Sequence, residues 1–329
     1  MVYVGIDVHR KRSQVAVLDD AGTQLSNRNY ENSSGDLRAV LDELEPGTGV
    51  AFEAAYGWGW LADLLEECEL EAHLAHPSAC KAIAHARLKN DKVDARILAQ
   101  LLRTDFLPEA WIAPKEIRDL RSLLRHRASL VRVRTSLKNR IHAVVADEGL
   151  KVEVGTLWSA EGETWLARVA LRPMHREIVD DCCGLLDALA TPIRRLDAEI
   201  RDQAEPDPRV EALRSLYGVG LITSMTLVAE IGDISRFPTA RKLCAWAGLT
   251  PSVHNSDVKV RHGHITKAGP AAVRAVLTEA SYQARHVAPF AKYFEEVAKR
   301  RGKRIATVAL SRKILARCFH ILKSLEEPA

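Results

Sequence analysis

Long hydrophobic runs and paired cysteines are both missing from this chain of 329 residues. No apolar stretch approaches the roughly 18 residues of a membrane span, so we expect no membrane-embedded segment. None of the six cysteines belongs to a Cys-x-x-Cys pair, so neither a zinc site nor a disulfide framework is indicated. The amino terminus enters a strand pattern directly, unlike a signal peptide. Together these absences predict a protein of a reducing cytoplasm.

Acidic residues are scarce in two stretches, although the formal net charge of the whole chain is only +4. Between Arg118 and Arg140 there are eight Lys or Arg residues and a single acid, Asp119. A second basic stretch, from Val297 to Leu325, contains no acid at all. Such runs indicate a polyanionic partner such as nucleic acid. The alternative is that both are solvated helix faces.

The chain is too long for one ordinary hydrophobic core, and its 47% of apolar residues suffices for two or three. Pro206-Asp207-Pro208 indicates a boundary, because two prolines interrupt a helix and keep the chain extended. We therefore expect three parts. They are an α/β domain at 1–108, a basic helical region at 109–205 and a mainly helical domain at 206–329.

The first part alternates short apolar runs with helical patterns. Three strands followed by alternating helix and strand indicate an α/β sheet covered by helices. This order resembles the ribonuclease-H-like fold. The expected strands are Val2–Val8, Ser13–Leu18, Gln24–Tyr30, Gly49–Glu53 and Ala72–Ala75, and the expected helices are Leu37–Leu44, Trp60–Cys68 and one from Pro77 toward Arg87.

Four acids in this part form the candidate catalytic site. Asp91 and Asp94 lie three residues apart where a helix begins, so they share one helix face. Asp7 and Glu53 occur in apolar strands upstream. Carboxylates at strand ends and on a late helix can hold Mg²⁺, which prefers hard oxygen ligands. The alternative is that Asn90 or Asp91 merely caps the helix.

The middle part reads as two long helices, over Ile117–Val145 and from Met174 to about Gln203. Leucines and a valine spaced by sevens on the first helix, and an apolar stripe on the second, predict an antiparallel or intermolecular coiled coil. The heptad residues are Leu123, Leu130, Leu137 and Val144, and the stripe is Cys182, Leu185, Leu189, Ile193, Leu196 and Ile200. The expected nucleic-acid contacts on the first helix are Arg125, Arg132, Arg134, Lys138 and Arg140.

The last part opens with helix, Gly218-Val219-Gly220 and helix, which resembles a helix-hairpin-helix. The turn amides at Gly218 and Gly220 can hold a DNA phosphate, although an ordinary two-helix corner has the same pattern. A polar loop from Leu249 to Asp257 contains Ser256, and reactive hydroxyls often lie in loops. Lys267 and Arg274 complete the expected nucleic-acid contacts. His262 and His264 are expected to face phosphate or solvent, because no further metal ligands are spaced around them.

Several motifs now coincide in order. They are Gly5-Ile6-Asp7-Val8, Phe52-Glu53-Ala54, Asn90-Asp91-Lys92-Val93-Asp94-Ala95, Gly218-Val219-Gly220, Ala247-Gly248-Leu249-Thr250-Pro251, Ser256 and Ile265-Thr266-Lys267-Ala268-Gly269. This ordered set resembles the DEDD transposases of the insertion-sequence-110 family over nearly the whole chain. The resemblance departs at Ala54-Ala55-Tyr56-Gly57, where Ala-Thr-Gly is usual, and at Asp257, where glycine is common. The second departure makes Ser252 a rival to Ser256.

The resemblance implies a RuvC-like catalytic domain, a coiled-coil middle and a transposase domain with a nucleophilic serine. Carried over by motif position, Asp7, Glu53, Asp91 and Asp94 would bind Mg²⁺ or Mn²⁺, and Ser256 would be the nucleophile. The implied partners are target and donor DNA, an element-encoded bridge RNA that guides the reaction, and further copies of the chain in a dimer or tetramer. A bacterial cytoplasm is the implied location, with no membrane partner.

The expected chemistry is site-specific recombination through a phosphoserine intermediate. Serine attack exchanges one phosphodiester for another, and no Gly-x-x-x-x-Gly-Lys-Ser/Thr loop for a nucleotide occurs. One alternative is a RuvC-like junction endonuclease in which water attacks and Ser256 is a bystander. Another is a non-catalytic nucleic-acid-binding protein whose acids are structural. A covalent protein–DNA adduct would separate the first reading from the other two.

Overall fold

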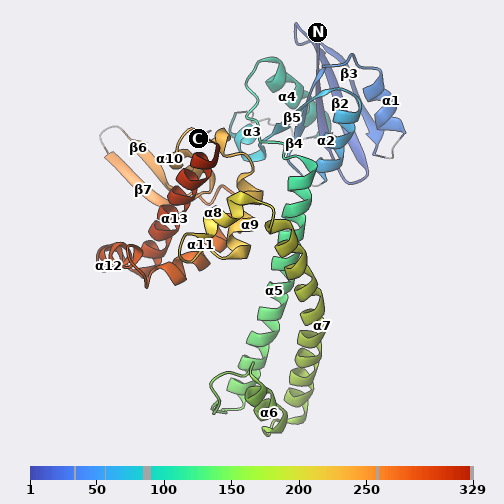
Figure 1. Cartoon of the computed structure of the whole chain (residues 1–329). Helices are drawn as coiled ribbons and strands as arrows, with labels where there is room; N and C mark the ends of the chain where they lie inside the picture. Colours follow the sequence, from blue (N-terminus) through green and yellow to red (C-terminus); the bar gives the residue numbers. More distant parts are fainter. Residues whose placement is uncertain (33–34, 56, 84–89, 257–258, 327–329) are drawn as a thin grey trace. The chain divides into compact units, whose positions relative to one another are not determined.

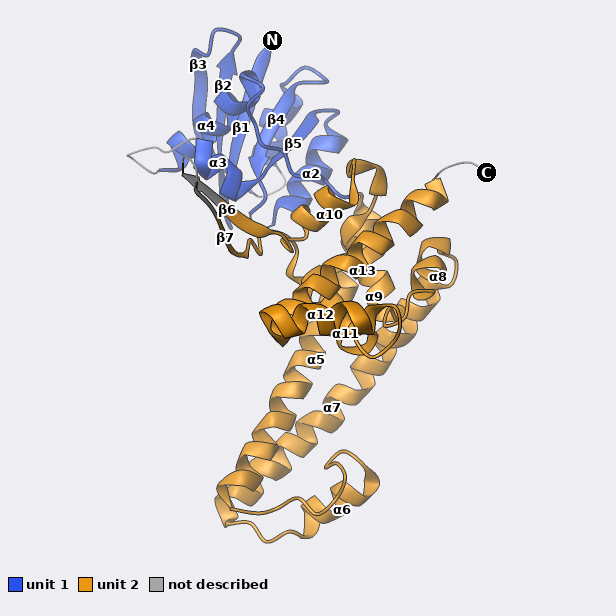
Figure 2. Cartoon of the chain, turned by 90° about the vertical axis from the view of Figure 1, so that its left-hand side faces the viewer, with its two compact units in different colours: residues 1–113 blue, residues 114–329 orange. Residues whose placement is uncertain are grey.

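The structure is a computed structural model that describes residues 1–32, 35–55, 57–83, 90–256 and 259–326. The chain divides into two compact units, residues 1–113 and residues 114–329 (Figure 2). Within the described ranges, no helix combines the length and the apolar character needed to cross a membrane.

The unit of residues 1–113 contains five strands and four helices in the part that the structure describes (Figure 1). The strands are β1 (Val2–Val8), β2 (Arg12–Asp19), β3 (Gln24–Glu31), β4 (Gly49–Glu53) and β5 (Glu71–Ala75). The helices are α1 (Asp36–Asp42), α2 (Trp58–Glu67), α3 (Pro77–Ile83) and α4 (Asp91–Arg103). The expected α/β sheet with covering helices is confirmed. The helix expected from Pro77 toward Arg87 is described over Pro77–Ile83, and the rest of that prediction falls on residues 84–89, outside the described ranges.

The strands form one sheet in the order β3-β2-β1-β4-β5. The pairs β3–β2 and β2–β1 are antiparallel, whereas β1–β4 and β4–β5 are parallel. Because side chains alternate along a strand, the sheet has two different faces. Val4, Ile6 and Phe52 belong to the larger core, which also contains residues of α1 and α2.

Gly5 lies on the opposite face of β1, where α4 packs directly on the backbone. A Cβ atom at this position would lie 2.0 Å from the carbonyl oxygen of Ala95 and 2.5 Å from the amide nitrogen of Ala99. Only glycine permits this approach. Ala51 and Leu98 share a small core between the same strands and helix. The close contact holds α4 against the central strands.

The unit of residues 114–329 is mostly helical (Figure 1). Its helices are α5 (Lys115–Asp147), α6 (Ala160–Arg168), α7 (Pro173–Ala204), α8 (Pro208–Arg214), α9 (Leu221–Ile231), the 3₁₀ helix η1 (Ile234–Arg236), α10 (Ala240–Trp246), α11 (Ala271–Ala284), α12 (Phe290–Arg301) and α13 (Lys303–Glu326). A two-stranded hairpin consists of β6 (Pro251–Ser256) and β7 (Lys259–Ile265).

Helices α5 and α7 pack side by side in opposite directions, with α6 at their far end (Figures 1 and 2). A small core that includes Ile141, Leu157 and Leu166 closes this end. One member of the expected apolar stripe is wrong, because Leu185 is 54% exposed. Leu186 packs against the core instead. Both positions fit helical spacing after Cys182, and tertiary contacts decide between them.

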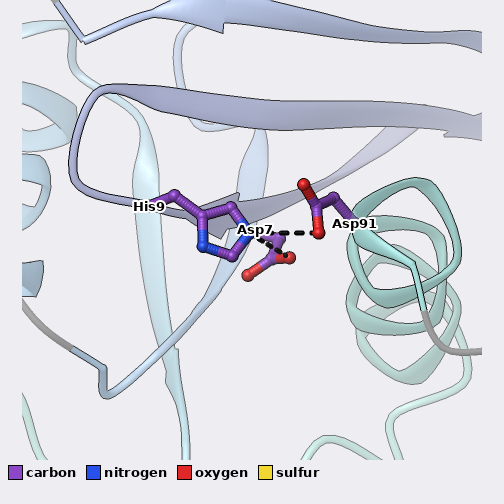
Figure 3. A group of neighbouring side chains, drawn as sticks. All are labelled: Asp7, His9 and Asp91. Carbon is purple, nitrogen blue, oxygen red and sulfur yellow. Dashed lines mark ion pairs between the residues drawn. The ribbon is translucent and has the colours of Figure 1, made fainter.

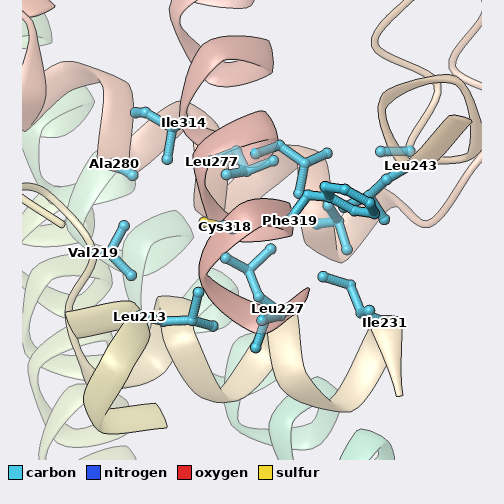
Figure 4. Packing of buried hydrophobic residues seen from close by; sticks show 14 of the residues in the cluster. Leu213, Val219, Leu227, Ile231, Leu243, Leu277, Ala280, Ile314, Cys318 and Phe319 are labelled. Atoms are coloured by element: carbon cyan, nitrogen blue, oxygen red, sulfur yellow. The ribbon is translucent and has the colours of Figure 1, made fainter. Parts of the chain in front are cut away.

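The remaining helices, together with Leu124 of α5 and Ile200 of α7, enclose the largest core among the described residues (Figure 4). Leu227, Leu277 and Phe319 meet there from α9, α11 and α13. The turn between α8 and α9 contains Gly218 in the left-handed region, with φ of +87°. A Cβ atom on this glycine would lie 2.5 Å from the carbonyl oxygen of Ala280, so α11 packs directly against the turn.

The polar loop expected around Ser256 is wrong, because its backbone forms the hairpin of β6 and β7. The base of this hairpin is held by backbone contacts between its two flanking segments. A Cβ atom on Gly269 would lie 1.8 Å from the Trp246 carbonyl oxygen. The Arg274 guanidinium donates hydrogen bonds to the carbonyl oxygens of Ala247 and Gly269. A Cβ atom on Gly248, in the other flanking segment, would lie 2.8 Å from the Ala268 amide nitrogen, so both segments need glycine where they meet.

Candidate metal centre and nucleic-acid interface

Asp7 lies near the end of β1 on the face that α4 covers, two residues after Gly5. It is only 8% exposed. Glu53 is the last residue of β4 and shares its face with Ala51. The parallel pairing of Ile6 with Phe52 makes Asp7 and Glu53 neighbours at the carboxyl ends of adjacent strands. The sheet therefore presents two of the four acids together.

Helix α4 supplies the other two acids from its first turn. Asn90 caps this helix, because its side-chain oxygen accepts a hydrogen bond of 2.9 Å from the Val93 amide. The cap is therefore Asn90, one of the two residues that the sequence allowed, and Asp91 is not needed for capping.

A polar network anchors the same turn of α4 to the sheet. The Asn27 side chain donates to the carbonyl oxygen of Lys92, at 2.9 Å. Gln14, opposite Asp7 on β2, donates to the Asn27 side chain at 2.6 Å. Gln14 is itself buried, at 2% exposure. The position of the two helix acids is thus fixed through contacts with β2 and β3.

One pocket brings all four acids together. It is lined by Asp7, Val8, His9, Arg10, Glu53, Ala55, Asn90, Asp91 and Asp94. Burial raises the pKa of Asp7, and although His9 opposes this, the carboxylates of Asp94, Asp91 and Glu53 raise it further. Several carboxylates close together supply the hard oxygen ligands that a divalent cation such as Mg²⁺ prefers. The residues present therefore suit a metal site.

His9 also joins this cluster, although it was not among the predicted site residues. Its Nε2 atom lies 3.2 Å from an oxygen of Asp7 and 3.2 Å from an oxygen of Asp91 (Figure 3). The ligand atoms of these three residues all lie within 4.8 Å of one another. A histidine two residues after a strand-end acid was the available signal, because both side chains then point to one side of the strand.

Ser256 is the last residue of β6, and its backbone pairs with Lys259 of β7. Asp257 and the side chain of Ser256 lie outside the part of the chain that is described. The rival Ser252 lies near the base of the hairpin. Its hydroxyl donates to the carbonyl oxygen of His264 at 3.4 Å and lies 2.4 Å from where a Cβ atom on Gly263 would be. The Ser252 hydroxyl is therefore packed against β7.

The expected nucleic-acid residues of α5 have different surroundings. Arg132 and Arg140 are exposed. The Lys138 ammonium lies 4.4 Å from the centre of the Trp158 ring, and burial, together with Arg134, lowers its pKa. Arg125 forms an ion pair of 2.8 Å with the buried carboxylate of Glu230. Only part of the basic run is therefore available to a partner without breaking internal contacts.

The expected nucleic-acid residues further along the chain also have different surroundings. Gly220 caps α9 and is exposed, whereas Gly218 packs against α11. Lys267 is exposed and adopts a left-handed backbone, with φ of +53°. Arg274 holds the hairpin base. A further basic group is exposed where α12 meets α13, and its members are Lys299, Arg300, Arg301, Lys303 and Arg304.

Sequence comparisons define the class of protein that carries this site. The family model for IS110-type DEDD transposases, described as "Transposase", matches residues 4–148. A second model, described as "Transposase IS116/IS110/IS902 family", matches residues 210–295. The chain is therefore an insertion-sequence transposase. More particularly, it belongs to the IS110 family of DEDD transposases.

Individual relatives agree with this family. The putative transposase y4qE of Sinorhizobium fredii is 26% identical over 95% of this chain and 78% of its own length. The transposase of insertion sequence element IS1111A from Coxiella burnetii is 26% identical over 94% of this chain and 86% of its own length. A probable family 20 transposase of Pseudomonas aeruginosa is 24% identical, with 94% and 93% covered.

Proposed function

We propose that this transposase cuts and rejoins DNA through a phosphoserine intermediate, with Ser256 as the nucleophile and a divalent cation at the acid cluster. The observation that carries the proposal is the convergence of four acids on one pocket in a chain of the IS110 family. The strand order β3-β2-β1-β4-β5, with acids at the ends of β1 and β4, supports a ribonuclease-H-like, RuvC-like fold for this unit.

Asp7, Glu53, Asp91 and Asp94 would hold the cation, which is Mg²⁺ or Mn²⁺ in this proposal. When bound, such an ion neutralises phosphate charge and favours the ionised form of a hydroxyl. The four acids would hold the positive charge of the cation in one pocket. The buried side chain of Asp7 would be its most rigidly held ligand. Hydrogen bonds from Gln14 to Asn27 and from Asn27 to Lys92 keep Asp91 and Asp94 facing the strand ends.

The proposed step keeps the number of phosphodiester bonds constant. The Ser256 oxygen bonds to phosphorus, the bond from phosphorus to one sugar oxygen breaks, and that oxygen takes up a proton. A second sugar hydroxyl then attacks the phosphoserine and releases the serine hydroxyl. Since the acids and Ser256 belong to different units of the chain, both units must act on the same phosphate. The packed hydroxyl of Ser252 supports Ser256 as the reacting serine.

The proposal includes three partners: target DNA, donor DNA and an element-encoded bridge RNA. The exposed positives on α5, at Lys267 and at the junction of α12 and α13 support nucleic-acid binding. Helices α5 and α7 would form the coiled-coil middle of a dimer or tetramer. In this reading the two-unit chain has the three functional parts 1–108, 109–205 and 206–329, with a helix-hairpin-helix-like element formed by α8 and α9.

The experiment that tests the function compares Ser256→Ala with Ser252→Ala. End-labelled DNA is incubated with each protein, RNA and Mg²⁺, and then resolved on a denaturing gel with and without protease. We expect wild type and Ser252→Ala to give a protease-sensitive shifted band, and Ser256→Ala to give neither the shift nor cleavage. If Ser256→Ala still cuts DNA and releases free ends, water is the nucleophile and the protein is a metal-dependent nuclease.

A further inference from the structure

His9 occupies a position that its backbone fixes. It lies just past β1, in the connection to β2, where its amide donates to the Arg12 carbonyl oxygen at 3.1 Å. Its own carbonyl oxygen accepts a hydrogen bond of 2.5 Å from the Asn32 side chain. The imidazole therefore emerges at the rim of the acid pocket, and its side chain is half exposed. This leaves Nε2 directed toward Asp7 and Asp91 (Figure 3).

A hydrogen bond alone is a poor explanation of this arrangement. One Nε2–H group donates well in one direction, yet Nε2 lies 3.2 Å from both carboxylates. Charge-assisted hydrogen bonds between nitrogen and carboxylate are usually about 2.7–2.9 Å long. Both separations are longer than this, and their equality fits three ligand atoms arranged around a common centre.

The separations match those between ligands of a metal ion. In an octahedral site with bonds of about 2.1 Å, adjacent ligand atoms lie about 3.0 Å apart. The two distances of 3.2 Å from Nε2 are close to this edge length. All three donor atoms lie within 4.8 Å of one another, so they can share one ion.

We propose that His9 Nε2 is a ligand of the cation at the acid cluster, together with Asp7 and Asp91. This inference rests on the metal site of the proposed function and adds a nitrogen donor to it. Imidazole binds Mn²⁺ and later transition ions better than it binds Mg²⁺. His9 therefore biases the site toward Mn²⁺, whereas a site of carboxylates alone would discriminate less.

The test uses the full chain loaded with Mn²⁺ and pulsed electron paramagnetic resonance, which detects nitrogen bonded to the ion. We expect ¹⁴N coupling in wild type, replaced by ¹⁵N coupling when histidine is labelled. The coupling should disappear in His9→Gln and persist in His126→Gln, a matched change at an exposed histidine of α5. Calorimetry should show that His9→Gln weakens Mn²⁺ binding by roughly tenfold or more and Mg²⁺ binding by less.

The outcomes separate this inference from the proposed function. If wild type binds Mn²⁺ without nitrogen coupling, or if His9→Gln retains the coupling, His9 is not a ligand and the carboxylate site stands. Unchanged or tighter Mn²⁺ binding by His9→Gln would likewise overturn the inference, because His9 would then only be a positive charge that the ion displaces. If wild type binds no divalent cation at all, the metal site of the proposed function fails as well.

Discussion

Asp91 and Asp94 lie on one turn of α4, and neither is needed to cap the helix, because Asn90 does so. We predict that Asp91→Asn or Asp94→Asn abolishes strand cleavage and weakens Mn²⁺ binding while the fold survives. Each change removes charge from the pocket and leaves the shape of the side chain almost unchanged. Cleavage assays and calorimetry measure the loss, and circular dichroism checks the fold.

The matched control for these variants is Asp105→Asn, the same charge change at an exposed residue just past α4 that does not line the pocket. We expect Asp105→Asn to keep wild-type cleavage and wild-type affinity for Mn²⁺. Near wild-type recombination by Asp91→Asn or Asp94→Asn in Mg²⁺ would show that these two acids are structural.

The charged Asp7 side chain lowers the free energy of unfolding of the metal-free chain, and a bound cation would remove this effect. Burial and the neighbouring carboxylates raise its pKa, so its charged form destabilises the folded chain at neutral pH, and protonation at lower pH relieves this cost. We predict that Asp7→Asn raises the Tm of the metal-free protein by a few degrees at pH 7. The added stability that Mn²⁺ gives to wild type should be absent.

Thermal unfolding at pH 7, with chelator and with Mn²⁺, measures both effects. A metal-free Asp7→Asn protein less stable than wild type would mean that the Asp7 carboxylate makes stabilising contacts in the fold. Equal stabilisation of both proteins by Mn²⁺ would place the ion elsewhere.

At the level of elements, the sequence predicted the five-stranded sheet well and the hairpin badly. Strands β1 and β4 are short apolar runs with one acid, Asp7 next to the end of β1 and Glu53 at the end of β4, so their bounds follow from the sequence directly. Strands β6 and β7 lack the regular alternation of apolar and polar residues that marks a half-buried strand. Their pairing depends on the contacts at Gly269 and Arg274, which come from distant segments.

The site was also only partly predictable. The four acids could be selected because charged residues in apolar strands, or paired on a helix turn, are unusual. His9 has only a weak signal, a histidine two residues after a strand-end acid, and it is the three-dimensional contact with Asp91 that makes it a candidate ligand. The same limit applies to Arg125, whose pairing with Glu230 joins residues far apart in the sequence.

Helix α5 offers a test of its nucleic-acid role with a matched charge change. Arg140 is exposed, whereas Arg127 is paired with Asp197 of α7. We predict that Arg140→Gln weakens nucleic-acid binding and lowers the magnitude of the salt slope by about 0.9 for duplex DNA, since one phosphate contact is lost. Arg127→Gln removes the same charge but should mainly affect stability.

Binding titrations at several salt concentrations, with fluorescently labelled DNA, measure these slopes. Equal slopes for Arg140→Gln and wild type would mean that this side of α5 is a spacer. If Arg140→Gln and Arg127→Gln lowered the salt slope equally, the effect would come from the net charge of the protein rather than from a contact between Arg140 and phosphate.

At the level of the whole molecule, the candidate metal ligands belong to residues 1–113 and the proposed nucleophile belongs to residues 114–329. A nuclease would need only the metal site, because water could attack the phosphate. A recombinase that works through a covalent intermediate also needs the serine, because the bond from serine to phosphorus preserves the phosphodiester until the DNA is rejoined. The presence and position of that bond therefore distinguish the proposed recombinase from a nuclease.

The most direct measurement is tandem mass spectrometry of the protein after reaction with DNA and RNA in Mg²⁺, quenching and digestion with protease and nuclease. We expect a nucleotide joined by a phosphodiester to the peptide that contains Ser256, with fragment ions that assign the added mass to that side chain. A nucleotide on Ser252 or another residue would contradict the assignment of the nucleophile. Cleaved DNA without any nucleotide-bearing peptide would contradict the recombinase mechanism itself.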